Sequence, residues 1–377
     1  MRKKKISVAI LTLNGYFNYG NRLQNYALEQ VLKTYADSVV TLNIKSNPKV
    51  FSNQIPNTHG NRLKRIFNRV ISGAKGKSLL LVFSTYYLWY INSRRKARFK
   101  DFSERYLHEV AVELDGSKIS AEIANSYDYF VVGSDQVWNP FFPEFSEVYF
   151  LTFAPLYKRI AYAPSFGVDT IPVDFEANFA FCLKSFKNLS VREESGSNLI
   201  EKMCGIKAEV LLDPTMLLSI DDWLKFAKPV TLIPRKNYIL VYFLGPIEFE
   251  VISRIRLFAK VNHMQIISLN DKRYPRYYSI DPREFVFLVH HCSIVITDSF
   301  HGVAFSIIFK KPFFIHQRNC EMDMSSRLET ILNKFDLQSR KGMELSNNNM
   351  EINYKDVEIS LNAERKKAKA FLHKCFL

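Results

Sequence analysis

Two stretches of the chain repeat a pattern in which a short apolar strand is followed by a helix with one apolar face. In the first stretch, residues 5–13 (KISVAILTL) have the pattern of a strand and residues 21–36 that of a helix. The second stretch begins at residues 237–244 (NYILVYFL) and continues through further strand–helix pairs. Alternating strands and helices build parallel sheets covered by helices. The pattern therefore predicts an α/β protein with two doubly wound, Rossmann-like domains that face a cleft.

The length agrees with two domains, because 377 residues are enough for each domain to bury a core of its own. We expect an N-terminal domain at 1–210, which contains a basic and aromatic helical insert at about 62–105. A linker is expected at 211–236 and a C-terminal domain at 237–350. The remaining residues, 351–377, are expected to form a tail and a helix.

The basic charge of the chain is concentrated in the insert. Lys and Arg exceed Asp and Glu by 52 − 37 = 15, and residues 62–105 contribute 12 − 2 = 10 of that excess. Within them lies an aromatic-rich apolar run at 79–91 (LLLVFSTYYLWYI), too short to cross a bilayer. Two interpretations stay open, a peripheral contact with an anionic membrane and a buried helix with basic neighbours. No nucleic-acid-binding motif accompanies the charge, so no nucleic-acid partner is expected.

The chain carries features of a cytoplasmic protein, located either free or at the inner face of the membrane. The first apolar run ends at Asn14 and is short for a secretory signal. The five cysteines are scattered without C-x-x-C spacing, which favours free thiols in a reducing compartment. The histidines have no metal-ligand spacing, so no metal site is expected.

The first expected strand is followed by a glycine-rich turn, NGYFNYGNRLQ, which contains Asn18, Gly20 and Asn21. Glycine permits close approach of the backbone, and asparagine can cap the following helix. An active-site turn and an ordinary strand-to-helix turn are equally consistent with this pattern. The turn is neither G-x-G-x-x-G nor a P-loop, so it does not indicate a nucleotide site.

A second polar cluster, VVGSDQVWNP, follows a strand and contains Asp135, Gln136 and Trp138. Asp135 can act as an acid, a base or an acceptor for sugar hydroxyls, and Trp138 can offer a ring face to a sugar. The alternatives are a capping aspartate and a core tryptophan. The clustering of these residues at the end of a strand favours function.

In LSVREES, Arg192 stands at the end of another strand, where it could hold a carboxylate or phosphate through two parallel hydrogen bonds. The alternative is an ion pair with Glu193 or Glu194 at the surface. The triplet Asp213–Pro214–Thr215 predicts a turn in the linker.

The segment VITDSFHGVAF combines Asp298 and Ser299 at the end of a strand with His301 and Gly302 in the first turn of a helix. A helix N-terminus favours anions through its free N–H groups and its dipole. Because histidine titrates near neutral pH, His301 is a candidate acid–base residue. A structural histidine is the alternative.

Seven segments, in this order, resemble the bacterial polysaccharide pyruvyl transferase family. They extend from Gly15 to Leu332, which is most of the chain. The segments are GYFNYGNRLQNYAL, VVGSDQVWNP, YAPSFG, LSVREESG, LLDPTMLL, ITDSFHGVAFSIIFKKPFF and SSRLETIL.

The resemblance implies a fold similar to the GT-B glycosyltransferases, with the active site between the two Rossmann-like halves. It also implies transfer of a pyruvyl group from phosphoenolpyruvate to two hydroxyls of one hexose, which forms a cyclic ketal and releases phosphate. The acceptor would belong to a surface polysaccharide or its lipid-linked precursor, and no cofactor is expected beyond phosphoenolpyruvate as co-substrate. Catalysis is assigned to His301 with Asp135 or Asp298, donor binding to Arg192, Asn21, Ser299, Gly302 and Arg318, and acceptor binding to Trp138, Gln136 and Asn18.

Two other functions are compatible with the predicted scaffold, since fold does not determine function. The first is a glycosyltransferase that uses a nucleotide sugar, against which the missing nucleotide-binding motif counts. The second is a non-catalytic carbohydrate- or membrane-binding protein. The joint presence of Arg192, Asp135 and His301 counts against it.

Overall fold

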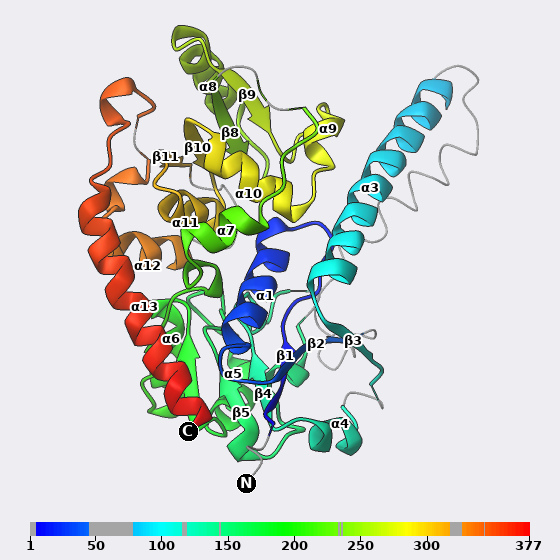
Figure 1. The fold of residues 1–377 in the computed structure, drawn as a ribbon, viewed down its shortest axis with the longest axis vertical. Helices are drawn as coiled ribbons and strands as arrows, with labels where there is room; N and C mark the ends of the chain where they lie inside the picture. The colour runs from blue at the N-terminus through cyan, green and yellow to red at the C-terminus, as the bar shows by residue number, and fades with distance from the viewer. Residues whose placement is uncertain are drawn as a thin grey trace.

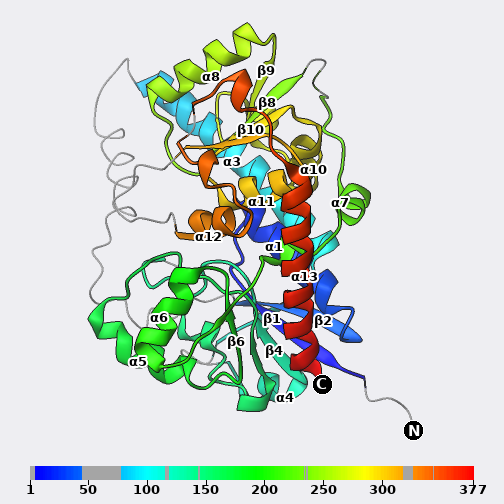
Figure 2. The ribbon, with the colours of Figure 1, turned by 90° about the vertical axis from the view of Figure 1, so that its left-hand side faces the viewer.

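The computed structural model describes residues 5–44, 78–114, 119–142, 145–232, 234, 237–316, 326–342 and 344–377, without the side chains of 78–83. Two parallel β-sheets, each covered by helices, lie one above the other in Figures 1 and 2. The predicted fold class, an α/β protein with two Rossmann-like halves, is confirmed.

The larger sheet has seven strands in the order β3-β2-β1-β4-β5-β6-β7, and all its described pairings are parallel. One of its interior strands, β1, is apolar after Ser7 and almost wholly buried, as expected for a strand covered by helices on both faces. The strands are β1 (Ser7–Leu11), β2 (Ser38–Ile44), β3 (Glu109–Val112), β4 (Tyr129–Val132), β5 (Arg159–Ala161), β6 (Asn188–Val191) and β7 (Glu209–Val210).

The smaller sheet has four parallel strands in the order β11-β10-β8-β9. Both of its central strands, β8 and β10, are buried at every position. The strands of the two sheets lie on opposite sides of the expected linker, 211–236. The bounds are β8 (Tyr238–Tyr242), β9 (Gln265–Ser268), β10 (Ile294–Thr297) and β11 (Phe313–Ile315).

The α-helices connect and cover these strands, and several begin at side-chain caps. Asp281, for example, forms a capping box with Glu284 at the start of α10. The helices are α1 (Tyr19–Leu32), α3 (Ser78–Tyr106), α4 (Ala121–Ser126), α5 (Val173–Leu183), α6 (Glu194–Cys204), α7 (Ile220–Phe226), α8 (Phe249–Val261), α9 (Pro275–Tyr278), α10 (Pro282–His291), α11 (Phe300–Ile308), α12 (Ser326–Lys334) and α13 (Tyr354–Phe376).

One hydrophobic core runs through both domains, because α1 of the N-terminal domain packs against α10 of the C-terminal domain. At this junction Tyr19 stacks on Phe285, with ring centroids 4.9 Å apart. Figure 2 shows α1, α11 and α12 in the layer between the two sheets. The domains are therefore joined by apolar contacts along one side of the seam.

The last helix, α13, returns from the C-terminal domain to the N-terminal domain, as Figure 1 shows. Near its end Phe376 stacks on Tyr35, and Arg365 donates hydrogen bonds to the backbone oxygens of Met216 and Leu218. The sequence predicts a helix here only at 364–374, so α13 is longer than expected and links the two domains.

Helix α3 accounts for the described part of the predicted helical insert, while residues 62–77 lie outside the described residues. The C-terminal half of α3 is anchored to both domains by Arg95. Its guanidinium donates hydrogen bonds to the backbone oxygens of Phe17 and Tyr278, at 2.6 and 2.8 Å. The helices of the described chain include none that is long and apolar enough to cross a membrane. Four of the five cysteines, Cys182, Cys204, Cys292 and Cys375, are free thiols, and Cys320 lies outside the described residues.

Candidate active site at the domain seam

The loops at the carboxyl ends of the two sheets bring two predicted site residues, Arg192 and His301, together with Asp213, for which only a turn was predicted. Arg192 follows β6, Asp213 follows β7, and His301 lies in the first turn of α11 after β10. All three are buried. Carboxyl ends of parallel strands are where such sheets bind ligands, so this position is a suitable one for an active site.

Asp213 is the centre of the cluster. Its Oδ2 atom accepts hydrogen bonds from Ser134 Oγ at 2.7 Å and Arg192 NH1 at 2.9 Å, and it lies 3.5 Å from His301 Nε2. Its Oδ1 atom accepts from the backbone N–H and hydroxyl of Thr215. Burial by itself would raise the pKa of Asp213, but His301, Arg192 and Ser134 outweigh it and hold the pKa well below its usual range.

Arg192 has unused hydrogen-bond donors although it is almost fully buried. Its NH1 group is taken by Asp213 and Ser134, but its Nε and NH2 atoms have no hydrogen-bond partner among the described residues. The guanidinium carbon lies 4.5 Å from the centre of the Phe300 ring. Leaving buried N–H groups unpaired costs about 1–3 kcal/mol per group, and an anion that accepts two parallel hydrogen bonds, such as a carboxylate or phosphate, would remove that cost.

His301 is enclosed between the two domains. Its Nε2 atom faces Asp213, while its Nδ1 atom faces the start of α1, where a Cβ atom added at Gly20 would lie only 2.0 Å away. Gly20 therefore permits a close approach that a larger residue would prevent. The carboxylate of Asp213 lies beside the imidazole, which is an arrangement suited to proton transfer.

Asp135 lies at a strained position beside the glycine-rich turn. Its backbone φ is 140°, a value that non-glycine residues rarely adopt and that is enriched at functional sites. Its Oδ2 atom accepts a hydrogen bond from Asn21 Nδ2 at 2.9 Å. Its neighbour Ser134 binds Asp213, so Asp135 and Asn21 adjoin the cluster of Arg192 and His301.

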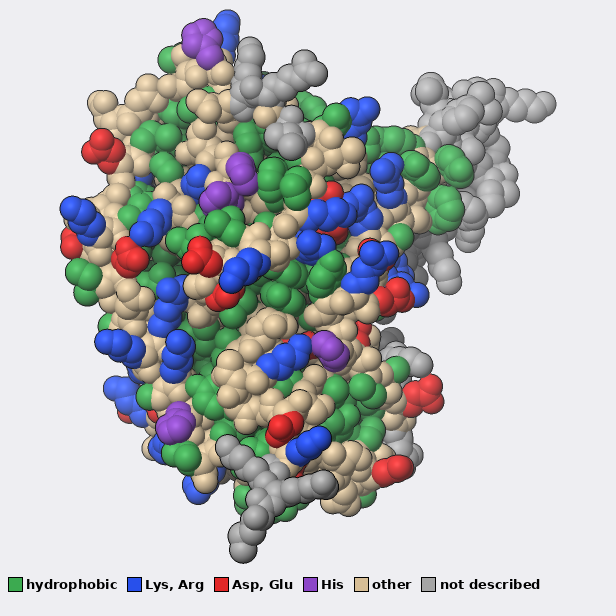
Figure 3. Space-filling view, in the orientation of Figure 1, with side chains coloured by type: hydrophobic (Ala, Val, Ile, Leu, Met, Phe, Trp, Pro, Cys, Tyr) green, Lys and Arg blue, Asp and Glu red, His purple; other side chains and the backbone are tan. Residues whose placement is uncertain are grey.

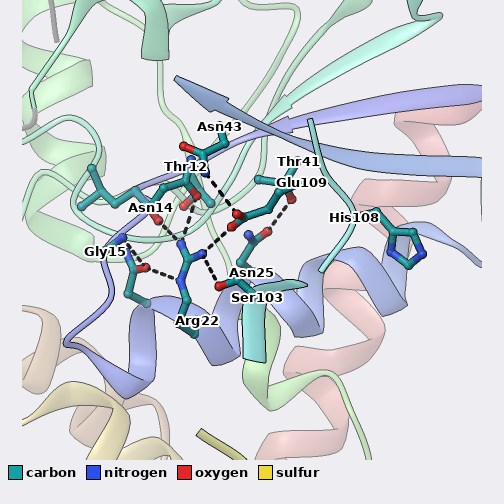
Figure 4. Close-up of polar contacts among 12 residues, drawn as sticks. Thr12, Asn14, Gly15, Arg22, Asn25, Thr41, Asn43, Ser103, His108 and Glu109 are labelled. Atoms are coloured by element: carbon teal, nitrogen blue, oxygen red, sulfur yellow. Dashed lines mark hydrogen bonds and ion pairs between the residues drawn. The ribbon is translucent and has the colours of Figure 1, made fainter. Parts of the chain in front are cut away.

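Arg22 holds the glycine-rich turn in place. Figure 4 shows its guanidinium at the centre of a network of polar contacts, which includes an ion pair with Glu109 at 2.6 Å. Further bonds from Arg22 go to Leu13 O, Asn14 Oδ1 and Asn21 Oδ1. Since Arg22 and the backbone of Gly15 occupy Asn21 Oδ1, the Nδ2 group of Asn21 is directed at Asp135.

The other residues assigned to catalysis or to the donor are placed as follows. Both carboxylate oxygens of Asp298 accept backbone hydrogen bonds, from Leu244 at 2.7 Å and Gly245 at 2.9 Å, so Asp298 holds the loop after β8. Gly302 packs on Thr297, and Ser299 precedes α11 without capping it through its side chain. Arg318 lies outside the described residues. Their roles remain predictions.

The acceptor assignment needs a correction at Trp138. Its ring is completely buried, stacks on Phe150 and donates through Nε1 to Tyr149 O, so it has no face to offer a sugar. Gln136 is also buried, with its side chain against Gly167. Asn18 is half-buried and caps α1 by accepting from Asn21 N. Trp138 is therefore a core residue, which was the alternative interpretation.

The sequence analysis missed the part played by Asp213. It predicted a turn, and Asp213 does cap the short 3-10 helix Pro214–Met216, but the same carboxylate contacts Arg192 and His301. The available signal was its place in LLDPTMLL, one of the segments that resemble the family. Among the described residues, no group of three or more His, Cys, Asp or Glu side chains is arranged to hold a metal ion.

Fold and site together define a two-domain parallel α/β protein with two features at the domain seam. One is a buried arginine with two nitrogen atoms that have no partner among the described residues, and the other is a histidine–aspartate pair. The family model described as polysaccharide pyruvyl transferase matches residues 18–315. The chain belongs to the polysaccharide pyruvyl transferase family, as the seven segments indicated. No curated protein sequence gives a significant match.

Among solved structures, the chain is similar to UDP-GlcNAc 2-epimerase from Neisseria meningitidis (12% identity, TM-score 0.43, covering 99% of this chain and 94% of that one). It is also similar to the UDP-GlcNAc 2-epimerase of Methanocaldococcus jannaschii (14%, 0.44, 95% and 92%). A third is ADP-heptose heptosyltransferase II of E. coli (10%, 0.36, 97% and 100%).

Proposed function

We propose that this enzyme transfers the pyruvyl group of phosphoenolpyruvate to two hydroxyls of one hexose, forming a cyclic ketal and releasing phosphate. The acceptor is a surface polysaccharide or its lipid-linked precursor. The observation that carries the proposal is the guanidinium of Arg192, buried beside His301 with two nitrogen atoms that have no partner among the described residues. Phosphoenolpyruvate offers a carboxylate and a phosphate to such a group.

The reaction balances with one proton donor that later acts as an acceptor. Protonation of the methylene carbon of phosphoenolpyruvate forms the methyl group and a cation at the adjacent carbon. One sugar hydroxyl adds to that carbon and loses its proton, then the bond to phosphate breaks. The second hydroxyl adds to the cation that results, and its proton leaves with phosphate. In the net reaction the two sugar hydroxyls lose two protons. The methylene carbon of phosphoenolpyruvate gains one of them and the released phosphate gains the other.

In this scheme His301 supplies the proton to the methylene carbon and takes one back from a hydroxyl. Asp213, which is ionised because its pKa is lowered, stabilises the imidazolium and keeps its ring in place. Arg192 binds the donor and balances the charge that moves onto phosphate. Asp135, whose Oδ2 atom is bound by Asn21, accepts from the acceptor hydroxyls in this scheme.

The test is phosphate release from phosphoenolpyruvate in the presence of a panel of free and lipid-linked hexosides. We expect release that depends on the acceptor, together with a gain in acceptor mass that equals one pyruvyl ketal. Release without an acceptor, or an acceptor mass that gains a hexose, would contradict the proposal.

A second measurement compares donors directly. A ligand that binds only the folded protein raises its melting temperature in proportion to the logarithm of its concentration above Kd. We expect stabilisation by phosphoenolpyruvate, reduced in Arg192→Lys, and none by nucleotide sugars. Stabilisation by a nucleotide sugar alone would favour the alternative, a glycosyltransferase of the GT-B type.

The location of the enzyme is part of the same proposal. A lipid-linked acceptor lies at the membrane, and a cytoplasmic enzyme with a peripheral contact through residues 62–105 would reach it.

A further inference from the structure

The N-terminal half of α3, which is its upper half in Figure 1, exposes five consecutive large side chains. Tyr86, Tyr87, Leu88, Trp89 and Tyr90 are between 40% and 63% exposed, with Tyr86 and Trp89 the most accessible at 63% and 61%. Figure 1 shows this half of α3 projecting away from the body of the molecule. A soluble surface seldom carries so many neighbouring aromatic groups unless they contact something.

These five residues do not form a single face of the helix. Successive residues of an α-helix are 100° apart, so Tyr86–Tyr90 cover its whole circumference. A partner helix or a sheet would cover one stripe and leave the other side chains in water. A lipid headgroup layer, into which the helix can be immersed, accommodates side chains on several sides at once, and Tyr and Trp are the residues that concentrate there.

A second basic and aromatic segment, which begins 185 residues after Tyr87 in the chain, lies beside this helix. It comprises Lys272–Arg276, where Lys272, Tyr274 and Arg276 are exposed. Tyr87 donates a hydrogen bond to the backbone oxygen of Lys272 at 3.3 Å. The body of the molecule thus places further cations next to the aromatic part of α3.

The cations of α3 itself divide into two kinds. Arg95 is buried in contacts with both domains, and Arg98 pairs with Glu284 at 2.6 Å, so neither is available to a ligand. Arg94 and Lys96 are exposed. Figure 3 shows hydrophobic side chains along the projecting part of α3 with Lys and Arg side chains next to them.

We propose that Tyr86–Tyr90, Arg94, Lys96, Lys272 and Arg276 form one surface, here named the interfacial surface, which binds the headgroup layer of an anionic membrane. The aromatic residues enter the layer, and the four cations contact lipid phosphates. This proposal goes beyond the proposed reaction and does not depend on it. It adds a second segment, Lys272–Arg276, which the sequence analysis did not connect with the membrane.

The tryptophans make the proposal directly measurable. Of the three in the chain, Trp138 and Trp223 are completely buried, so an emission change on adding vesicles reports Trp89. With vesicles of phosphatidylcholine containing phosphatidylglycerol we expect a blue shift and protection from acrylamide. Phosphatidylcholine alone should give a much weaker effect. The Trp89→Phe substitution should remove the shift, but the variant protein should still co-sediment with the anionic vesicles.

Variants that remove cations from one segment at a time measure the contribution of α3 and of Lys272–Arg276 to membrane binding separately. Each Lys or Arg near an anionic surface contributes roughly 1 kcal/mol, so Arg94→Gln/Lys96→Gln and Lys272→Gln/Arg276→Gln should each weaken binding by roughly 30-fold. The matched control, Lys366→Gln/Lys369→Gln, removes two exposed lysines from α13 on the opposite side of the molecule and should change binding by less than threefold.

Three results would overturn the proposal. One is absence of binding to the anionic vesicles, and another is binding that is equal for neutral and anionic vesicles. The third is a Trp89 shift that appears without vesicles as protein concentration rises, which would assign the surface to a second copy of the chain. None of these measurements uses phosphoenolpyruvate or an acceptor, so failure here is distinct from failure of the proposed reaction.

Discussion

Two arginines of the N-terminal domain are equally deep and yet differently used. Arg22 and Arg192 are both buried, and each forms an ion pair with one carboxylate, Glu109 at 2.6 Å and Asp213 at 2.9 Å. In Arg22 all three nitrogen atoms donate hydrogen bonds to the protein. In Arg192 only NH1 does so among the described residues.

The difference separates an arginine that maintains the fold from one that is kept for a ligand. The complete set of bonds at Arg22 fixes the turn between β1 and α1, as expected for a buried charge with a structural purpose. The incomplete set at Arg192 lowers stability unless an anion is bound, which proteins tolerate where binding recovers the cost. The comparison predicts opposite consequences for changes in the two networks.

The largest effect is expected for His301→Ala, beside Arg192. Loss of the acid–base group should lower kcat by about 10²–10⁴-fold, because general acid–base catalysis contributes a factor of that size. Phosphate release would measure it, with far-UV circular dichroism as the check on folding. His291→Ala, a change at an exposed position at the end of α10 in the same domain, is the control and should retain activity. A folded His301→Ala enzyme with near-normal kcat would refute the assignment.

The next effect concerns the Arg22 network and stability. Glu109→Gln removes the charge that compensates Arg22, and breaking a buried ion pair on one side costs about 3 kcal/mol or more. We therefore expect the free energy of unfolding in urea to fall by about 3 kcal/mol. The KM for phosphoenolpyruvate should stay within threefold. A large rise in KM without a loss of stability would show that Arg22 belongs to the ligand site.

Arg192→Lys should have the reverse effect. Lysine keeps a positive charge beside Asp213, so stability should change little, but it cannot present two parallel donors to an anion. The donor KM should rise roughly 100-fold, equivalent to about 3 kcal/mol for the lost charge-assisted bonds. Arg159→Lys is the matched control, because every nitrogen of Arg159 is used within the N-terminal domain. An unchanged donor KM in Arg192→Lys would show that the unpaired nitrogens of Arg192 do not bind the donor, and that Arg192 does not differ from Arg22 in this way.

The sequence predicted the fold class and most central strands because their apolar residues are continuous and they are bounded by polar turns. β1, β8 and β10 are strands of this kind. It missed β3 and β7, which lie at the edges of the larger sheet and have only four and two residues. The return of α13 to the N-terminal domain was also missed, since docking over such a distance leaves no local pattern.

The site was predictable where a residue type has few alternative uses. Arg192 and His301 at strand ends were candidates with structural alternatives, and the family resemblance favoured a site between the two halves. The structure brings the two residues together around Asp213. Asp213 itself was not predicted, because its partners lie 79 residues before it and 88 after it, at Ser134 and His301. Trp138 shows the opposite error. A buried tryptophan and a sugar-stacking tryptophan have the same sequence context, and only packing distinguishes them.

The smallest predicted effect tests whether the Arg192 cluster depends on the close contact between domains. In a helix, alanine is more stable than glycine by about 1 kcal/mol, so Gly20→Ala would ordinarily favour α1. Its new methyl carbon would lie 2.0 Å from Nδ1 of His301, and the ring or the helix must therefore shift. A displacement of about 1 Å can lower a rate by up to about 100-fold, and we expect kcat to fall at least tenfold with little change in stability. Gly15→Ala, where nothing lies within 4 Å of the added Cβ atom, is the control in the same turn. Equal kcat in the two variants would contradict this prediction. It would mean that the reaction occurs with His301 moved away from α1, and therefore not in the arrangement of the two domains described here.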